Sequence, residues 1–215
     1  MHKYDAVIWD MDGTLLNTLD DLRDSVNAAL AAFSLPPRTP EEIRRFIGNG
    51  VLQLLTLSVP DGRENPRFEE IFSFFSAHYS GNFCNRTRPY AGLERLLPAL
   101  KRRGYKLAIV SNKVESALKA LAAHYFGGTI ALAIGDTEGI RRKPWPDKLL
   151  HALEILGVEK KKAVYIGDTE VDIQTAGNAG IDCICVSWGF RDRPELLASG
   201  AKVIVDSPEQ LLQSL

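Results

Sequence analysis

Six short apolar runs, rich in valine and isoleucine, recur along the chain and are its most constraining feature. They are AVIWD (6–10), KLAIVS (106–111), TIALAIG (129–135), AVYIGD (163–168), CICVSW (183–188) and KVIVD (202–206). Near-continuous hydrophobicity without alternation is typical of strands that are buried on both faces, as in a parallel sheet. Helix-like stretches separate most of the runs, and left-handed glycine caps are expected at Gly104, Gly157 and Gly180. The pattern predicts an α/β protein with a doubly wound parallel sheet.

The alternation of strand and helix is interrupted once, between the first two runs. Residues 19–84 show helical periodicity, and TPEEIRRFI opens with a capping-box pattern of Thr39, Pro40 and Glu42. A structureless loop of this length is uncommon inside a compact domain. We therefore expect a core domain, residues 1–16 and 85–215, that carries an inserted helical domain, residues 17–84.

Composition narrows the class of ligand. The chain has 215 residues, is 45% hydrophobic and 25% charged, and carries a net charge of −1 without a long basic block. These values fit an ordinary globular protein that binds a small molecule, and they argue against nucleic acid as a partner. No run approaches the ~20 apolar residues of a membrane span, and no signal peptide is recognisable, so no membrane association and a cytoplasmic location are expected. Either a monomer or a homodimer is compatible with the sequence.

Polar and acidic side chains follow the ends of the predicted strands, where parallel sheets bind ligands. They are Asp10, Asp12, Ser111, Asn112, Asp136 and Asp168. Clustered carboxylates are unfavourable at neutral pH unless a cation is bound or one carboxyl stays protonated. Oxygen ligands without nearby histidine or cysteine favour a hard cation, and Mg²⁺ is expected because it pairs with substrate phosphate.

Two short motifs at this edge each allow more than one interpretation. Asp10 and Asp12 belong to an Asp-x-Asp-Gly sequence that also fits a simple Asx turn, in which Gly13 permits the bend and Thr14 offers donors to an anion. Lys143 precedes a proline, which favours an extended backbone and projects the ammonium from its loop. An isolated Lys-Pro of this kind is usually a solvated loop, but here it follows the third strand.

Taken together, the ordered blocks WDMDGT (9–14), VSN (110–112), KPWPD (143–147) and GDTEVD (167–172) resemble the haloacid dehalogenase superfamily in its phosphatase branch. The resemblance covers essentially the whole chain, and the helical insertion lies where that family carries its cap. It implies a Rossmann-like core, a mobile cap and Mg²⁺-dependent phosphoryl transfer through an aspartyl-phosphate. The four ordered blocks make this resemblance specific.

The resemblance and the charge balance of the reaction suggest a role for each motif residue. Asp10 is the expected nucleophile, Asp12 the acid and base, and Lys143 the cation that neutralises the phosphoryl group. The expected phosphate-binding residues are Gly13, Thr14, Ser111 and Asn112, and the expected metal site comprises Asp10, Asp12, Asp168 and Asp172. Asp172 either binds the metal directly or orients its neighbours.

The sequence GDTE occurs twice, and the two copies are interpreted differently. The copy at 167–170 is followed by Asp172 at helical spacing and is the expected metal motif. The copy at 135–138 leads only to the loop that delivers Lys143, so Asp136 has at most an outer contact with the site.

Among phosphatases the chain is most similar to phosphoglycolate phosphatases, in its SNK (111–113) and IGNGVLQLL (47–55) segments. Gly48 and Gly50 either let the cap backbone approach a small substrate or simply form a turn between two helices. Arg45 or Lys113 is a candidate partner for a carboxylate of the substrate. The expected substrate is 2-phosphoglycolate. Pyrophosphatase and nucleotide or sugar phosphatase activity stay open. The absence of a histidine at the start of the cap disfavours a sugar phosphomutase.

The sequence disfavours two other classes of protein. A non-catalytic binding protein that retains the fold is disfavoured because every motif residue is present. A dinucleotide-dependent oxidoreductase would need Gly-x-Gly-x-x-Gly after the first strand, and DMDGTL stands there instead.

Overall fold

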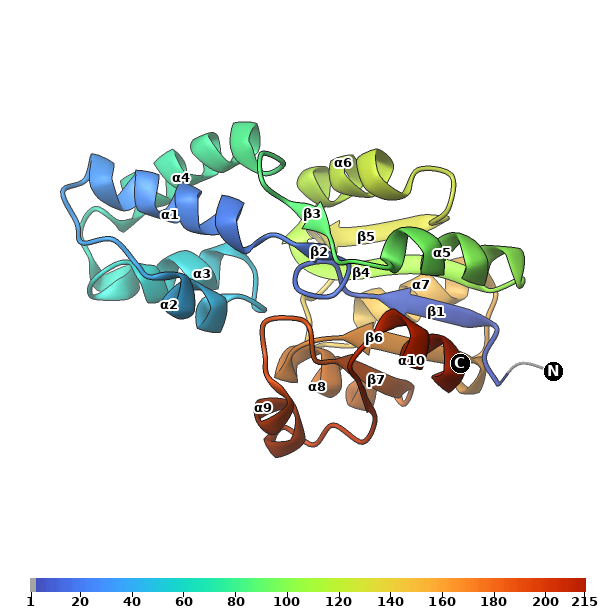
Figure 1. Ribbon diagram of the computed structural model, residues 1–215. Helices are drawn as coiled ribbons and strands as arrows, with labels where there is room; N and C mark the ends of the chain where they lie inside the picture. The colour runs from blue at the N-terminus through green and yellow to red at the C-terminus, as the bar shows by residue number, and fades with distance from the viewer. Residues whose placement is uncertain (1–2) are drawn as a thin grey trace.

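A six-stranded parallel sheet organises the protein and confirms the predicted fold class. The computed structural model describes residues 3–215 and has the strand order β5-β4-β1-β6-β7-β8 (Figure 1). The strands are β1 (Ala6–Trp9), β4 (Lys106–Val114), β5 (Leu132–Asp136), β6 (Ala163–Gly167), β7 (Asp182–Val186) and β8 (Ile204–Val205). Because β1 lies between β4 and β6, the strand order reverses beside it.

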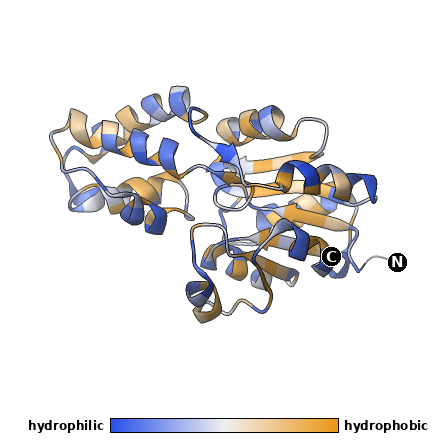
Figure 2. Ribbon diagram, viewed as in Figure 1, coloured by the Kyte–Doolittle hydropathy of each residue, from blue (hydrophilic) through white to orange (hydrophobic). Residues whose placement is uncertain are grey.

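Helices cover both faces of the sheet, which explains the continuous apolar runs. The helices after residue 90 are α5 (Leu93–Arg102), α6 (Glu115–Phe126), α7 (Asp147–Leu156), α8 (Glu170–Ala179), α9 (Arg193–Ala198) and α10 (Pro208–Ser214), with a short 3-10 turn η2 (Lys160–Lys162). Helices α5, α6 and α10 pack on the face that carries Val7 and Trp9, whereas α7 and α8 pack on the face of Ile8 and Tyr165. In Figure 2 the strands of the sheet are mostly hydrophobic, and the helices carry both hydrophobic and hydrophilic residues.

The remaining helices form a separate lobe beside the sheet (Figure 1). They are α1 (Leu19–Ala32), α2 (Pro40–Phe46), α3 (Val51–Ser58) and α4 (Phe68–Asn82), with a 3-10 turn η1 (Gly62–Glu64). Their buried side chains, among them Leu30, Ile43, Leu55 and Phe75, make a hydrophobic cluster distinct from those of the sheet. We call this lobe the cap.

A short antiparallel pair, β2 (Leu16–Asn17) and β3 (Arg88–Pro89), joins the cap to the sheet. The chain therefore enters and leaves the cap through two adjacent segments. The domain division at residues 16/17 and 84/85 stays a prediction.

Local signals in the sequence match the structure closely, although the bounds of several strands differ by one to three residues, as at β4. Gly104, Gly157 and Gly180 have φ angles of 90°, 61° and 71°, which confirms the left-handed caps. Strand β4 does not end at Ser111 but continues to Val114, after a shift in register beyond Val110. Asn112 and Lys113 consequently lie on an extended backbone at the carboxyl end of the sheet.

The predicted capping box of α2 is confirmed: the Thr39 hydroxyl accepts from the Glu42 N–H at 3.2 Å, and the Glu42 carboxylate accepts from the Thr39 N–H at 2.8 Å. We expect Thr39→Ala to lower the free energy of unfolding by about 1 kcal/mol, because the N–H of Glu42 loses its partner. Thr39→Ser keeps the hydroxyl and serves as the control. Urea denaturation measures the free energy of unfolding of both variants. Equal stability of the two would contradict a stabilising role for the Thr39 hydroxyl at the N-terminus of α2.

Candidate active site

The carboxyl ends of three neighbouring strands, β4, β1 and β6, lie where the sheet faces the cap (Figure 1). Asp10 directly follows β1, Asp168 directly follows β6, and the segment from Ser111 to Lys113 ends β4. This edge is the place where the strand order reverses and where open parallel sheets bind ligands.

Three buried carboxylates, those of Asp10, Asp168 and Asp172, form a cluster. One oxygen from each lies within 4.8 Å of the others. Burial raises the pKa of Asp168 well above its usual value, and the charges of Asp172 and Asp10 raise it further. Burial also raises the pKa of Asp10 to about 6, although Lys143 opposes the effect. The cluster therefore favours a bound cation, which would lower the cost of ionising Asp10 and Asp168.

The donor set of this cluster fits a hard divalent cation. It consists of carboxylate oxygens, which Mg²⁺ prefers, whereas zinc sites are usually built from cysteine and histidine. The predicted ligands Asp10, Asp168 and Asp172 are thus brought together by the fold.

Asp168 is held in a tight cradle made by two glycines. A Cβ atom at Gly13, where φ is +85°, would lie 2.2 Å from Asp168 Oδ2, and one at Gly189 would lie 2.3 Å from Asp168 Cβ. The Thr14 hydroxyl donates to Asp168 Oδ1 at 2.7 Å, and the Phe190 N–H donates to Oδ2 at 2.8 Å. Gly13 and Thr14, which the sequence suggested as phosphate-binding residues, therefore orient Asp168 in this structure.

Lys143 supplies the positive charge within the acidic cluster. Its Nζ lies 2.9 Å from Asp10 Oδ1 and 2.7 Å from Asp172 Oδ1, and it donates to the Tyr165 hydroxyl at 3.1 Å. Burial acts to lower the pKa of Lys143, but the two carboxylates outweigh it and the net pKa is raised. The side chain is therefore a permanent cation beside Asp10.

Asn112 fixes the backbone of Lys143. Its side-chain oxygen accepts from the Lys143 N–H at 2.9 Å, and its amide donates to the Lys143 carbonyl at 3.0 Å. The same amide lies 3.2 Å from the carbonyl of Gly48 in the cap. Asn112 thus joins the loop of Lys143, the strand β4 and the cap.

Both oxygens of Asp172 already have several partners. Oδ2 accepts from the main-chain N–H groups of Asp168 and Thr169 at 3.2 and 3.0 Å, and from the Thr169 hydroxyl at 2.7 Å. Oδ1 accepts from Lys143. This arrangement favours orientation of Lys143 and of the start of α8 over direct metal ligation by Asp172.

Asp12 is paired with a second buried lysine. The Lys113 Nζ donates to Asp12 Oδ1 at 2.8 Å and to the Tyr79 hydroxyl at 2.6 Å. Burial acts to lower the pKa of Lys113, but Asp12 and Tyr79 more than offset it and the net pKa is raised. Tyr79 belongs to α4 of the cap. The sequence did not identify it as a site residue, because an aromatic residue at this position of a helix is expected to pack in the core of the cap.

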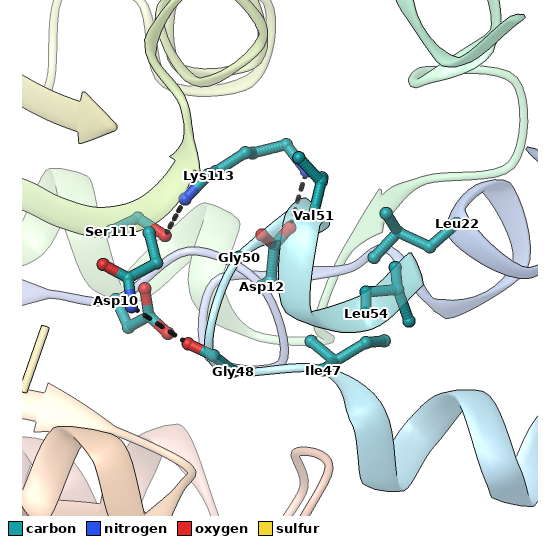
Figure 3. A pocket seen from close by; sticks show the side chains of 11 residues that line it. Asp10, Asp12, Leu22, Ile47, Gly48, Gly50, Val51, Leu54, Ser111 and Lys113 are labelled. Carbon is teal, nitrogen blue, oxygen red and sulfur yellow. Dashed lines mark hydrogen bonds and ion pairs between the residues drawn. The ribbon is translucent and has the colours of Figure 1, made fainter. Parts of the chain in front are cut away.

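A small cavity of about 30 Å³ lies between the cap and the sheet (Figure 3). Its core side is formed by Asp10, Asp12, Ser111, Asn112 and Lys113, and its cap side by Leu22, Ile47, Gly48, Gly50, Val51 and Leu54. A Cβ atom at Gly50, where φ is +83°, would lie 3.2 Å from the Asn112 carbonyl oxygen. The two glycines of the cap therefore allow its backbone to approach the site.

Arg45 does not reach this cavity, in contrast to its proposed role at the substrate. Its side chain is exposed. Successive residues of a helix point about 100° apart, so Arg45 lies on the side of α2 opposite Ile43, which faces the cap core. The neighbouring Arg44 instead reaches the loop between β7 and α9, and donates to the carbonyls of Phe190 and Gly189 at 2.7 and 2.9 Å.

A second arginine completes this contact between cap and core. Arg191 donates to the carbonyls of Arg44, Arg45 and Ile47 at 3.0, 3.2 and 3.1 Å, and Glu170 holds its guanidinium at 2.9 and 3.1 Å. The segment 189–191 therefore contacts α2 on one side and Asp168 on the other.

The two GDTE copies lie in different surroundings. Asp136 pairs with Arg142 at 2.6 Å and lies 3.5 Å from the buried Lys148. Asp168 belongs to the carboxylate cluster, and Asp136 does not.

The fold and this geometry agree with the family to which the chain belongs. The sequence model of the haloacid dehalogenase-like hydrolases matches residues 7–186, and the chain is a member of that family. The match confirms the resemblance drawn from the four motifs.

Named relatives place the chain more closely. A phosphoglycolate phosphatase from Aquifex aeolicus (strain VF5) is 36% identical over 187 residues, which cover 86% of this chain and 85% of that protein. A candidate phosphoglycolate phosphatase from Lactobacillus delbrueckii subsp. bulgaricus has a solved structure with a TM-score of 0.94 and 37% identity, covering 99% of this chain and 98% of that one. The structure of CbbY from Rhodobacter sphaeroides in complex with phosphate has a TM-score of 0.79 at 26% identity, covering 97% and 96% of the two chains.

These similarities confirm that the chain is an enzyme of the haloacid dehalogenase type, in its phosphatase branch. Within residues 3–215, no helix is long and apolar enough to span a membrane.

The raised pKa values of Asp10 and Asp168 predict how Mg²⁺ stabilisation depends on pH. A carboxyl whose pKa is raised from ~3.9 by folding contributes stability that is present at low pH and is lost as pH rises through the folded pKa, about 6 for Asp10. A cation offsets this loss, so Mg²⁺ should raise the melting temperature more at about pH 7.5 than at about pH 5.

Thermal melts with and without Mg²⁺ at the two pH values test this expectation. Asp168→Asn should abolish most of the shift, and Asp136→Asn should retain it. A shift as large at the lower pH, or one that persists in Asp168→Asn, would contradict the metal assignment.

Proposed function

We propose that this enzyme is a Mg²⁺-dependent phosphomonoester hydrolase that forms an aspartyl-phosphate on Asp10 and acts on 2-phosphoglycolate. The observation that carries the proposal is the ammonium of Lys143 between Asp10 and Asp172, inside a cluster of buried carboxylates. A carboxylate that attacks a phosphate dianion needs positive charge at the site, and Lys143 provides it without a conformational change.

Asp10 is the nucleophile in this proposal. It lies at the end of β1 and lines the cavity, where its carboxylate attacks phosphorus and the bond to the ester oxygen breaks. Ser111 also lines the cavity, and its oxygen accepts from the Lys113 N–H at 3.3 Å. The hydroxyl proton of Ser111 is therefore available to a phosphoryl oxygen.

Asp12 acts on the leaving oxygen. It lines the cavity two residues after the nucleophile, and its carboxyl group donates a proton to the departing alcohol and then removes one from the water that hydrolyses the intermediate. The same residue thus serves in both halves of the reaction.

The metal site proposed here uses Asp10, Asp168 and the main-chain carbonyl of Asp12, with Asp172 as the orienting carboxylate. Mg²⁺ bound there would neutralise charge on the phosphoryl oxygens. Gly13 and Thr14 support this site through Asp168.

The substrate class is supported by the named relatives. The relative from Aquifex aeolicus is named phosphoglycolate phosphatase. Residues 17–84 act as the cap domain in this proposal, and the cytoplasmic location and the monomeric or homodimeric state stay predictions.

The nucleophile assignment is tested with p-nitrophenyl phosphate. We expect Asp10→Asn to lower kcat by at least about 10³-fold, because the amide cannot form the intermediate, and EDTA to abolish the wild-type activity. Asp136→Asn changes the other GDTE copy and is the matched control, for which we expect less than about a threefold change. Turnover by Asp10→Asn at the wild-type rate would refute the assignment.

The substrate is tested by comparing kcat/KM for 2-phosphoglycolate, pyrophosphate, a sugar phosphate and a nucleotide. We expect the highest value for 2-phosphoglycolate, because the relatives from Aquifex aeolicus and Mesorhizobium japonicum are named phosphoglycolate phosphatases. A higher value for any of the other compounds would overturn this part of the proposal and leave the phosphatase mechanism standing.

A further inference from the structure

Lys113 is the one lysine or arginine that lines the cavity, as far as residues 3–215 are concerned. The other cations nearby have partners elsewhere: Lys143 is held by Asp10 and Asp172, and Arg44 donates to main-chain carbonyls outside the cavity. A second anionic group on the substrate would therefore meet its counter-charge at Lys113.

The ammonium of Lys113 is fixed and almost fully desolvated. Its side chain is 1% exposed, and Nζ contacts Asp12 Oδ1 at 2.8 Å and the Tyr79 hydroxyl at 2.6 Å. An ammonium has three N–H donors, and these two contacts use two of them. The third donor is available to a ligand in the cavity, and Figure 3 shows Lys113 beside Asp12 at the cavity wall.

Tyr79 brings the cap into this contact. Its ring stacks on Phe75 with centroids 5.6 Å apart at 9°, and meets the edge of Phe83 at 6.3 Å. These neighbours leave the Tyr79 hydroxyl little freedom, so the ammonium of Lys113 is fixed between a cap residue and a residue of the catalytic loop.

The distance from Asp12 limits where the second anion lies on the substrate. In the proposed mechanism Asp12 hydrogen-bonds to the ester oxygen, and Lys113 lies 2.8 Å from Asp12. With hydrogen bonds of about 2.8 Å on each side, an anion bound by Lys113 lies within about 8 Å of the ester oxygen, a limit that the carboxylate of a short phosphorylated acid meets.

We infer that Lys113 binds a carboxylate on the same short chain as the ester oxygen of the substrate, and that Tyr79 is a positioning residue that holds the ammonium beside Asp12. The inference rests on the proposed function and adds the residues that select a short phosphorylated acid. A phosphorylated alcohol of the same size lacks the group that Lys113 recognises.

The test compares 2-phosphoglycolate with ethyl phosphate, which has the same two-carbon chain without the carboxylate. The readout is the ratio of their kcat/KM values in the full-length enzyme. Lys113→Met should lower this ratio by about 10- to 100-fold, mainly through KM for 2-phosphoglycolate, because a hydrogen bond between charged groups is lost. Tyr79→Phe should lower it by about 3- to 10-fold.

Lys119→Met, on the exposed face of α6, is the control and should leave the ratio as in the wild type. If ethyl phosphate turns over too slowly, the inhibition constants of the two compounds against p-nitrophenyl phosphate give the same ratio. If Lys113→Met does not fold, Tyr79→Phe decides alone.

The outcomes separate this inference from the proposed function. If Lys113→Met folds and leaves the ratio of the two kcat/KM values unchanged, the inference is overturned. If only Tyr79→Phe folds, an unchanged ratio in that variant overturns it. Equal losses for both esters indicate a structural role of Lys113 and overturn it as well. No hydrolysis of any phosphate ester by the wild type would instead defeat the proposed function.

Discussion

The repulsion among three buried carboxylates is the constraint around which the site is built. Asp10, Asp168 and Asp172 each place an oxygen within 4.8 Å of the others, away from solvent. Lys143 offsets part of that repulsion through its contacts with Asp10 and Asp172, and a divalent cation would offset the rest. The site is therefore poised to attract further positive charge and, once it is neutralised, to accept a phosphate dianion.

The fold keeps these charges together by making the surrounding backbone rigid. Parallel strands deliver Asp10 and Asp168 to one edge, and the sheet is buried on both faces, so neither residue has room to withdraw. Phe190 connects this edge to the cap: its N–H holds Asp168, and its carbonyl accepts from Arg44 of α2. The position of the cap and the geometry of the carboxylate cluster are thus physically linked through one residue.

Much of this arrangement was predictable because it is encoded locally. Continuous apolar runs identified the strands, and the acid after each strand identified Asp10 and Asp168. The spacing of Asp172 distinguished the two GDTE copies. Several contacts that the sequence did not reveal cross from cap to core. Tyr79 reads as an ordinary core residue of α4, and only tertiary packing brings its hydroxyl to Lys113. Arg44 and Arg45 are indistinguishable in sequence and both are exposed, yet only Arg44 has a side chain that hydrogen-bonds to the core domain.

The central claim, that Asp10 forms a covalent intermediate, is tested most directly by trapping it. In Asp12→Asn the intermediate should accumulate, because the residue that activates water is lost, while the leaving group of p-nitrophenyl phosphate departs as p-nitrophenolate and needs no proton. Acid quenching during turnover, borohydride reduction and mass spectrometry of the peptide that contains residue 10 reveal the result. The account predicts homoserine at position 10, the product of reducing an aspartyl-phosphate. Phosphate release with Asp10 unmodified, or with the label on another residue, would contradict it.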